Sequence, residues 1–507
     1  MTLSSRWKQR LCKSAICTST PLLLIGTLVR LIGLGDHSFW FDEALEVGRA
    51  LTPWPKLLFL TEGPDPPLYR LLLAGTLQVS RHEFVVRLPS VAFSILTVCL
   101  VYRWLAQLRH RRLGFITALL LTVSPASIYY AREVGQYSVA LFLAALLLNA
   151  FEMIHREGSR LDWAFLWLVS MLALYTYYGL AWLLPALVID SAWRIWRAQG
   201  WRGLVPLSLY LSASGVGIAL LLILYIRPQY IWMSQVSLNR SFSEQGWWQI
   251  VNAFGRQLYP SVIRPLMLML IPVPGHTGWL TEVLGVSLSI LMLAGCILIW
   301  RRLPSLRRLL WILMSILASF YVASGFGCYH FGYRYALPVL PFLLMLVAVS
   351  IEFLLDRQIP FAGLLGGFIC LVFVAFWPQT RLLADPWPDI QREEIRPVLQ
   401  YLVQQADEDD TIYVYYGAIP AYRVYNMLPD YHTVYGNWIR HLPANDKVGA
   451  VLEATGAPDH LWLVFTHIWA DEDTLIVEGL LSDCVGYQLT DSYWVRDAVA
   501  VRLSRVR

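Results

Sequence analysis

The chain has 507 residues, of which 57% are hydrophobic and only 15% are charged, and its formal net charge is +5. Soluble globular domains carry about 25% charged residues, so this composition excludes an ordinary soluble protein and indicates an integral membrane protein. The basic residues stand in short connections between apolar segments. That pattern is typical of membrane topology and speaks against a nucleic-acid partner.

The first apolar run extends from about residue 15 to 34. Its length, and the lack of a small-residue cleavage site after it, predict a transmembrane helix rather than a signal peptide. Four basic residues precede the run: Arg6, Lys8, Arg10 and Lys13. Since basic flanks favour the cytoplasmic side, the N-terminus is predicted to be cytoplasmic. Arg30 lies near the outer end of the helix, where we expect it to snorkel to the interface.

Later apolar runs have about the length needed to cross a bilayer. They lie at about 88–107, 113–130, 137–153, 163–178, 180–193, 204–226, 281–300, 309–325, 336–355 and 361–378. Together with the first run they predict about eleven transmembrane helices. Every second connection is rich in arginine, from Arg109 to Arg308, which predicts that those connections are cytoplasmic.

Residues 66–80 are apolar but short, and counting them as a span would place the arginines of residues 109–112 outside. They are therefore predicted to form a helix in the outer interface. Residues 35–87 then form one large extracytoplasmic loop. The odd number of spans also places the C-terminus outside. The predicted location is the plasma or inner membrane.

The composition becomes more polar after about residue 378, and residues 381–507 are predicted to form a small extracytoplasmic α/β domain. Residues 391–405 have a helical pattern, whereas residues 411–416 and 460–465 have strand patterns. Residues 493–503 have the pattern of one or two strands. The sequence thus predicts a polytopic α-helical domain over residues 1–380, followed by this α/β domain.

Polar residues that are suited to chemistry fall on the outer face in this topology. They form four groups: Asp42–Glu43; Glu62–Tyr69 with Asp65, followed by Arg87; Ser124–Tyr137 with Arg132 and Glu133; and Tyr329–Pro338 with His330 and Arg334. Charged residues at a membrane boundary are expensive unless they serve a function or find partners. The four groups therefore indicate a site at the outer end of the helix bundle.

Each group also has a structural interpretation. Asp42 is a residue type that often begins a helix. Arg87 suits an interface anchor, and Glu133 suits an ion pair with a neighbouring arginine. His330 and Arg334 suit an anchor at the lipid headgroups.

These motifs resemble those of a known protein family. Five of them occur in the order seen in the GT-C membrane glycosyltransferases: Trp40-Phe-Asp-Glu-Ala44, Asp65-Pro-Pro-Leu-Tyr69, Arg87-Leu-Pro-Ser90, Ser124-Pro-x-x-x-Tyr-Tyr130 with Glu133 and Tyr137, and Arg334-Tyr-x-Leu-Pro338. The resemblance covers about residues 10–380. It is strongest to the family 39-like group, which includes protein O-mannosyltransferases and lipid A aminoarabinose transferases.

The resemblance implies a polyprenyl-phosphate-linked sugar as donor and transfer on the extracytoplasmic face of the bilayer. It implies that Asp42 is the catalytic base, with Glu43 as its motif partner, and that Arg334 and Arg87 bind the lipid phosphate. The predicted substrate-binding set is Arg334, Arg87, Arg132, Glu133, Asp65, Tyr137 and His330. The acceptor is left open between a protein hydroxyl, a glycolipid and a polysaccharide.

Two positions depart from the family. Many members have histidine in place of Asp65 and arginine in place of Gly135. No ligand spacing requires a metal, and no cofactor is indicated, although the outer carboxylates are of a type that binds a divalent cation. Two alternatives remain open: a transporter or lipid flippase without covalent chemistry, and an assembly subunit that has lost activity.

Overall fold

The computed structural model describes residues 15–59, 62–63, 65–156, 158–235, 279–325, 337–357, 393–439, 442–468, 471–482 and 485–506. Within these residues the chain divides into two compact units. The first comprises the described residues within 1–32, 54–72 and 87–387. The second comprises residues 33–53, 73–86 and 388–507. The predicted domain boundary at 380/381 lies outside the described residues.

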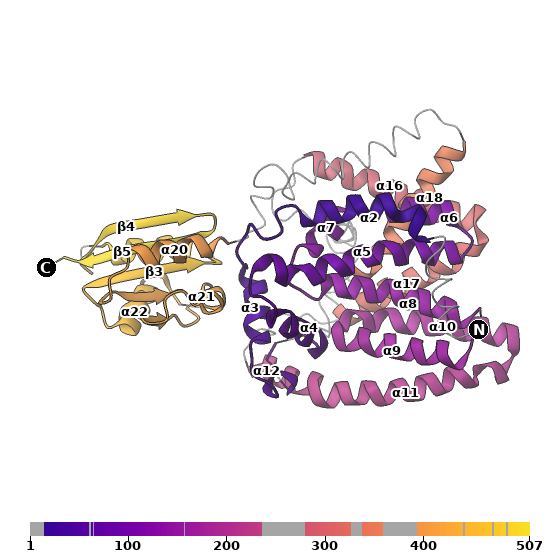
Figure 1. Cartoon of the computed structure of the whole chain (residues 1–507), viewed down its shortest axis with the longest axis horizontal. Helices are drawn as coiled ribbons and strands as arrows, with labels where there is room; N and C mark the ends of the chain where they lie inside the picture. The colour runs from indigo at the N-terminus through magenta and orange to yellow at the C-terminus, as the bar shows by residue number, and fades with distance from the viewer. Residues whose placement is uncertain are drawn as a thin grey trace. The chain divides into compact units, whose positions relative to one another are not determined.

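The first unit is built from helices (Figure 1). They are α2 (Ala15–Leu31), α4 (Pro67–Leu77), α5 (Glu83–Gln107), α6 (Arg111–Val123), α7 (Pro125–Ala131), α8 (Tyr137–Ile154), α9 (Arg160–Thr176), α10 (Leu183–Gln199), α11 (Val205–Leu221), α12 (Arg227–Gln235), α16 (Trp279–Arg302), α17 (Arg307–Gly325) and α18 (Leu340–Asp356). The unit boundary passes through α4 and α5. Helix α8 packs on α9, α9 on α11, and α18 on both α6 and α16.

Four helical segments in the described residues are long and apolar enough to cross a membrane: Glu83–Gln107, Tyr137–Ile154, Trp201–Ile231 and Leu337–Asp356. Two bent helix pairs raise this number to six if each pair is one span. The structure thus confirms the helical membrane-protein class, but it does not confirm the predicted number of eleven spans. The predicted run at 361–378 lies outside the described residues.

A sharp bend of 56° separates α6 from α7 at Ser124–Pro125. Pro125 has no N–H to continue the ladder of α6, and the Ser124 side chain accepts a hydrogen bond from Ser127 N–H as the cap of α7. The carbonyl of Thr122, near the end of α6, accepts instead from the Arg30 guanidinium on α2 at 3.0 Å.

Arg30 is fully buried, so the prediction that it snorkels to the interface is wrong. Its guanidinium also donates to Ser94 Oγ and Ser127 Oγ at 2.9 Å, and to the carbonyl of Gly26 at 3.0 Å. A buried charge is tolerable only when its donors are satisfied. Arg30 therefore joins α2, α5, α6 and α7 through neutral acceptors.

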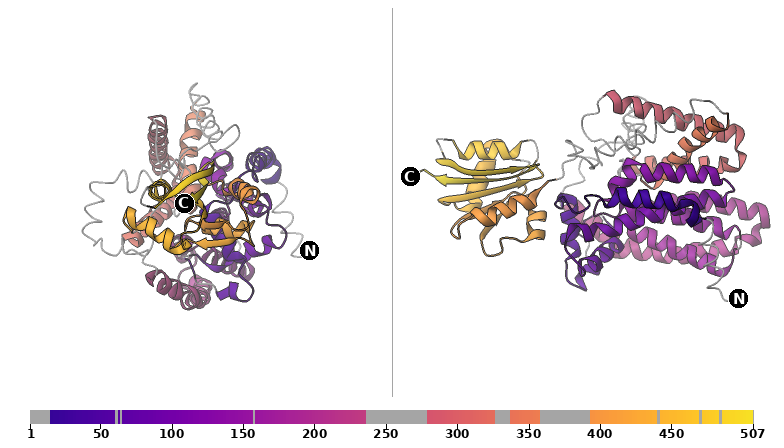
Figure 2. Two further views of the ribbon diagram at one scale, coloured as in Figure 1. Left: turned by 90° about the vertical axis from the view of Figure 1, so that its left-hand side faces the viewer. Right: turned by 45° about the horizontal axis from the view of Figure 1, so that its top comes forward.

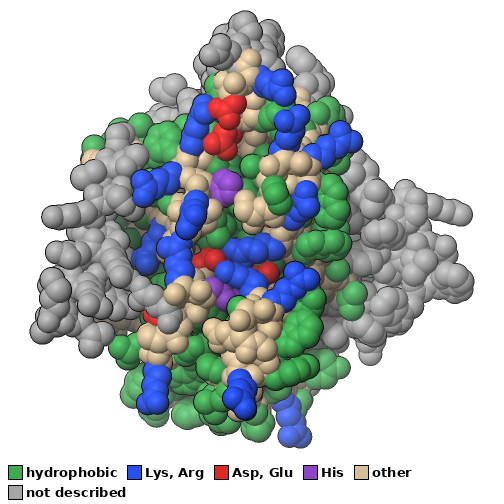
Figure 3. Space-filling model, turned by 90° about the vertical axis from the view of Figure 1, so that its right-hand side faces the viewer, with side chains coloured by type: hydrophobic (Ala, Val, Ile, Leu, Met, Phe, Trp, Pro, Cys, Tyr) green, Lys and Arg blue, Asp and Glu red, His purple; other side chains and the backbone are tan. Residues whose placement is uncertain are grey.

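The arginine-rich connections gather at one end of the first unit, where Lys and Arg side chains surround a few acidic ones (Figure 3). Arg308, at the start of α17, contacts Glu152 at 2.5 Å and Asp190 at 3.1 Å. Arg194 on α10 also contacts Glu152, at 3.3 Å. Glu152, Arg194 and Arg308 lie on α8, α10 and α17, each close to an arginine-rich connection. The ion pairs therefore show that these connections share one end of the bundle.

The second unit contains a five-stranded sheet in the order β2-β1-β3-β5-β4. Its strands are β1 (Thr411–Val414), β2 (His432–Tyr435), β3 (His460–Thr466), β4 (Tyr487–Val495) and β5 (Ala498–Arg505), and its helices are α3 (Phe41–Ala50), α20 (Ile395–Gln405), α21 (Ile419–Tyr425), α22 (Ala444–Thr455) and α23 (Glu472–Leu480). Strands β1, β2 and β3 are parallel, whereas β5 pairs antiparallel with both β3 and β4. Figure 2 shows helices on both faces of the sheet.

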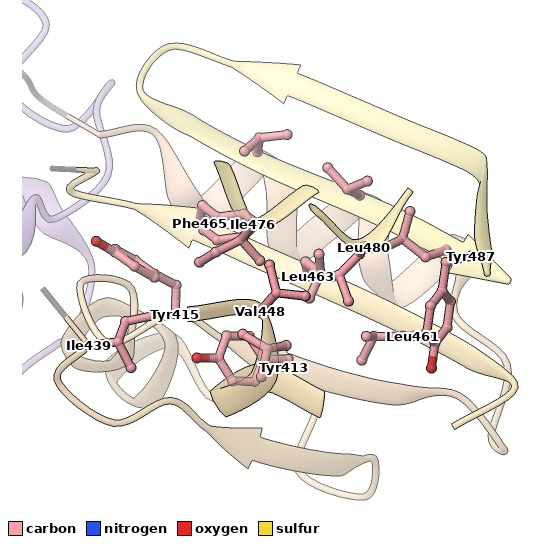
Figure 4. Close-up of a cluster of buried hydrophobic side chains, with 14 of the residues drawn as sticks. Tyr413, Tyr415, Ile439, Val448, Leu461, Leu463, Phe465, Ile476, Leu480 and Tyr487 are labelled. Carbon is pink, nitrogen blue, oxygen red and sulfur yellow. The ribbon is translucent and has the colours of Figure 1, made fainter. Parts of the chain in front are cut away.

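One face of the sheet packs against α22 and α23 in a single hydrophobic core (Figure 4). Leu461, Leu463 and Phe465 alternate along β3 toward this core, as expected for a strand with a period of two. On α23, Ile476 and Leu480 lie four residues apart and face the sheet together. Helix α20 contacts β4 and β5 and stacks its Tyr401 edge-on against Trp462 of β3.

The predicted elements of the tail are confirmed as α20, β1, β3 and the β4–β5 hairpin. The predicted short helix over residues 66–80 is confirmed as α4. Strand β2 was not predicted. It is four residues long and its side chains are exposed or half-buried, so the apolar alternation that marks a strand is missing from its sequence.

Candidate active site

Asp42 and Glu43, the predicted catalytic carboxylates, lie in the first turn of α3 in the second unit. Glu43 is fully buried, whereas Asp42 is half-buried. Carboxylates at this end of a helix are favoured by the helix dipole. Of the two, Asp42 is the more exposed to solvent. The structure therefore divides the pair into an accessible carboxylate and an enclosed one.

Helix α3 lacks a local cap. Its N-cap residue is Trp40, whose side chain makes no capping hydrogen bond. The missing acceptor comes from a segment more than 350 residues away, because Glu393 Oε2 accepts from Phe41 N–H at 2.7 Å. A charged acceptor at a helix start satisfies one of the free N–H groups there and interacts favourably with the dipole.

The neighbouring Glu394 holds the chain just before α3. Its Oε2 accepts from Ser38 N–H at 3.0 Å and from Ser38 Oγ at 2.9 Å. Its Oε1 contacts the His37 ring nitrogen Nδ1. Two adjacent glutamates therefore fix the residues that lead into Asp42.

A second network joins the same segment to α20 and α21. Tyr425 accepts from Phe39 N–H at 2.8 Å and donates to Glu83 at 2.7 Å. Arg396 donates to Glu83 at 2.7 Å and to the carbonyl of Asp36 at 3.0 Å. The Phe39 ring also stacks on that of Tyr425. Residues 36–41 are thus held by both polar and aromatic contacts.

Glu393 is almost fully buried and has a second partner in His467, whose Nδ1 lies 2.7 Å from Oε1. The His467 ring stacks on Phe41 with centroids 4.3 Å apart. Burial raises the pKa of the Glu393 carboxyl and the charge of Asp42 acts in the same direction, while the hydrogen bond from His467 opposes them. The carboxylates of Glu393 and Asp42 are therefore electrostatic neighbours.

The remaining described candidates belong to the first unit. Arg87 is buried near the start of α5, and Ser90, one turn further on, donates to the carbonyl of Glu133 at 2.8 Å. Residues three apart on a helix share a face, so this bond brings the turn of Arg87 next to Glu133. The structure therefore places these two predicted residues in one region.

Arg132 directs its guanidinium to the end of α2, where Nη1 donates to the carbonyls of Ile32 and Val29. It thereby satisfies carbonyls that the helix leaves open. The Tyr137 ring packs against Tyr130, with centroids 4.9 Å apart. A side chain at Gly135 would meet the Tyr137 ring at 3.2 Å, so the family's arginine would crowd it there.

Asp65 lies in a polar chain that the sequence analysis missed. Its Oδ1 accepts from Gln136 Nε2 at 2.6 Å, and its carbonyl accepts from Gln229 Nε2 at 2.8 Å. Gln229 in turn accepts from Tyr178 Oη at 2.8 Å. Gln229 comes from α12, far along the chain, so no local motif connects it with Asp65.

Arg70 was also missed. It is almost fully buried on α4, five residues after Asp65. The available signal was a charged residue inside an otherwise apolar helix, which is a functional candidate by default in a membrane protein. His330 and Arg334 lie outside the described residues. In the part of the chain that is described, no group of three or more His, Cys, Asp or Glu side chains is arranged to hold a metal.

Comparison with known proteins shows what this chain is similar to. Residues 64–232, about a third of the chain, match the sequence model of the dolichyl-phosphate-mannose-protein mannosyltransferase family. That range contains Asp65, Arg87, Arg132, Glu133 and Tyr137. Comparison with curated proteins gives no match.

The fold resembles that of ArnT from Cupriavidus metallidurans in the apo state, with a TM-score of 0.53, 15% identity, and coverage of 96% of this chain and 98% of ArnT. ArnT bound to undecaprenyl phosphate gives 0.49 at 13% identity, covering 96% and 98%. The Archaeoglobus fulgidus oligosaccharyltransferase with Zn and sulfate gives 0.47 at 12% identity, covering 87% and 67%. The family match and the ArnT fold confirm the resemblance to the GT-C membrane glycosyltransferases.

Proposed function

We propose that this protein is a membrane glycosyltransferase that moves a sugar from a polyprenyl-phosphate donor to an acceptor on the extracytoplasmic face. The observation that carries the proposal is the coincidence of two findings. A mannosyltransferase family model matches residues 64–232, which contain Asp65, Arg87, Arg132 and Glu133, and the fold of ArnT extends over 96% of the chain.

The donor class is supported by the family match. Dolichyl-phosphate mannose, which the family name specifies, is a sugar joined to a lipid phosphate. Such a donor already carries a good leaving group. The chemistry then needs a base to take the proton of the acceptor and cations to stabilise the departing phosphate.

Asp42 is the proposed base. It stands half-buried in the first turn of α3 beside the buried Glu43. Arg334 and Arg87 are proposed to hold the phosphate, with Arg132 as a further candidate, because a guanidinium binds phosphate through two parallel hydrogen bonds. One base and one displacement imply inversion at the anomeric carbon. Glu133, Asp65, Tyr137 and His330 are proposed to contact the sugar or the acceptor.

The test uses the purified full-length protein in lipid nanodiscs with a panel of radiolabelled polyprenyl-phosphate sugars and a membrane extract as the source of acceptor. We expect covalent transfer by the wild type. Asp42→Asn should lower the turnover by about 10²–10⁴-fold, which is the usual contribution of a well-placed base. Glu453→Gln, on an exposed position of α22, is the matched control and should transfer normally.

The outcomes separate the candidate functions. Unaltered turnover in Asp42→Asn would remove Asp42 from the mechanism. Movement of the labelled lipid across a bilayer without any transfer would favour a flippase instead. Arg334→Ala should raise the apparent KM for the donor more than that for the acceptor, and an unchanged donor KM would contradict the phosphate role.

A further inference from the structure

In the α/β part of the second unit, another segment of the same chain lies at the carboxyl ends of the parallel strands. In open sheets of parallel strands, ligands bind at the carboxyl ends of the strands, where the strand order reverses. Here the chain leaves β1, adds β2 on one side and then returns to add β3 on the other. His467 follows β3 directly, and α21, which ends at Tyr425, follows β1. The segment that occupies this edge is residues 36–41.

The contacts at this edge concentrate on the start of α3. Glu393 provides the acceptor for Phe41 N–H that Trp40 fails to provide. Glu394 binds both the N–H and the hydroxyl of Ser38. Because the next residue after Phe41 is Asp42, any displacement of the first turn of α3 displaces the proposed base as well.

We infer that Glu393 and Glu394 are positioning residues for Asp42. At the carboxyl ends of the parallel strands, the C-terminal α/β domain caps α3 and holds the proposed catalytic carboxylate in place. Glu393 is suited to this role for a second reason. It is buried, bonded to His467 on its other oxygen, and close enough to Asp42 for their charges to interact.

A purely structural role predicts a different result from a positioning role. If the two glutamates only attach the segment to the sheet, their loss should loosen the whole α/β domain. If they position Asp42, the loss should be confined to residues 37–45 and should lower kcat while the donor KM changes little. This inference rests on the proposed function for its kinetic readout alone.

The experiment compares wild type, Glu393→Ala, Glu393→Gln, Glu394→Ala and the exposed control Glu453→Gln as full-length protein in nanodiscs. Hydrogen exchange measured by mass spectrometry reports on residues 37–45 and, separately, on β1 and β3. Transfer from radiolabelled polyprenyl-phosphate sugars gives kcat and the donor KM.

In Glu393→Ala we expect the amides at the start of α3 to exchange about tenfold faster or more, since a charged cap is lost. A displaced catalytic group can cost about 10²-fold, so kcat should fall by about that factor while the donor KM stays within about threefold. Glu393→Gln should fall between wild type and Glu393→Ala, because its amide oxygen still accepts the bond from Phe41 N–H but carries no charge.

Wild-type exchange at residues 37–45 in both alanine variants would overturn the inference. So would equal acceleration in β1, β3 and α3 in the isosteric Glu393→Gln, which keeps the size of the side chain and serves if an alanine variant fails to fold. If wild type transfers no sugar from any donor, the proposed function fails, and the exchange data alone then decide the positioning inference.

Discussion

A buried polar network in the α/β domain offers a sharp test of how that domain is held together. Glu472, in the first turn of α23, accepts from Lys447 Nζ on α22 at 2.5 Å. Its other oxygen accepts from the hydroxyls of Tyr415 and, at 2.9 Å, Tyr416, just after β1. Lys447 and Glu472 are both buried. The network therefore joins α22 and α23 to the segment that follows β1.

The expected magnitude follows from leaving one buried charge without its partner, which costs about 3–5 kcal/mol. The loss of stability in Glu472→Gln should lie near the upper end of this range, because the ammonium of Lys447 then faces a neutral amide. Lys447→Met should lie near the lower value, since Glu472 keeps its two tyrosine donors. The double variant buries no unpaired charge, so its cost should fall short of the sum by at least about 2 kcal/mol.

The assay is hydrogen exchange of the β3 amides in the full-length protein, measured where exchange reports the free energy of local opening. A loss of about 3 kcal/mol corresponds to exchange that is about 150-fold faster. Glu453→Gln, on the exposed face of α22, should leave the exchange unchanged. Additive costs of the two single substitutions would refute the reasoning, because they would mean that the two charges do not interact.

Three further predictions concern single positions. Burial by itself would raise the pKa of Glu472, but the hydrogen bonds from Lys447, Tyr415 and Tyr416 hold this pKa below its ordinary value of 4.5. The stability that this carboxylate contributes should therefore be present above pH 4.5 and be lost as the pH falls further. A pH series of β3 hydrogen exchange that lacks this loss would contradict the assignment. Gly295→Ala would place a Cβ against the Leu346 carbonyl oxygen at the contact of α16 with α18, so it should cost about 1–3 kcal/mol and lower the Tm in detergent. Gly215→Ala, with open space around it on α11, should not lower the Tm. Asp410→Ala removes the acceptor of Trp462 Nε1 at 2.9 Å, so it should lower the free energy of local opening at β3 by about 1–3 kcal/mol, measured by hydrogen exchange. A similar loss in Asp409→Ala, at the exposed neighbouring position, would argue against a specific role of this bond.

Local sequence patterns were sufficient to predict a helical membrane part followed by an α/β tail. Apolar runs predicted the helices of the first unit, and the change in composition near residue 378 predicted the α/β tail with its central strands. Both signals arise within windows of 10 to 20 residues, because burial in lipid or in a sheet acts on consecutive or alternating side chains. The exposed edge strand β2 carries no such signal.

Sequence motifs also found Asp42, Glu43, Arg87 and Glu133 as candidates, since charged residues beside apolar runs are conspicuous. They did not reveal the partners of these residues. Gln229 approaches Asp65 from 164 residues away, and nothing in its own segment marks it as part of a site. Arg30 was expected at the interface, but its guanidinium is buried and donates to the Thr122 carbonyl and to the hydroxyls of Ser94 and Ser127.

The amino-acid sequence by itself determined that this chain is a helical membrane protein with the motif order of the GT-C glycosyltransferases, because hydropathy and motif order are properties of neighbouring residues. Only the tertiary structure decided that Glu393 caps the helix that begins at Phe41. The physical reason is that a free N–H at a helix start requires an acceptor but does not specify where in the chain that acceptor comes from. In this protein it comes from Glu393, which is 352 residues away in the sequence.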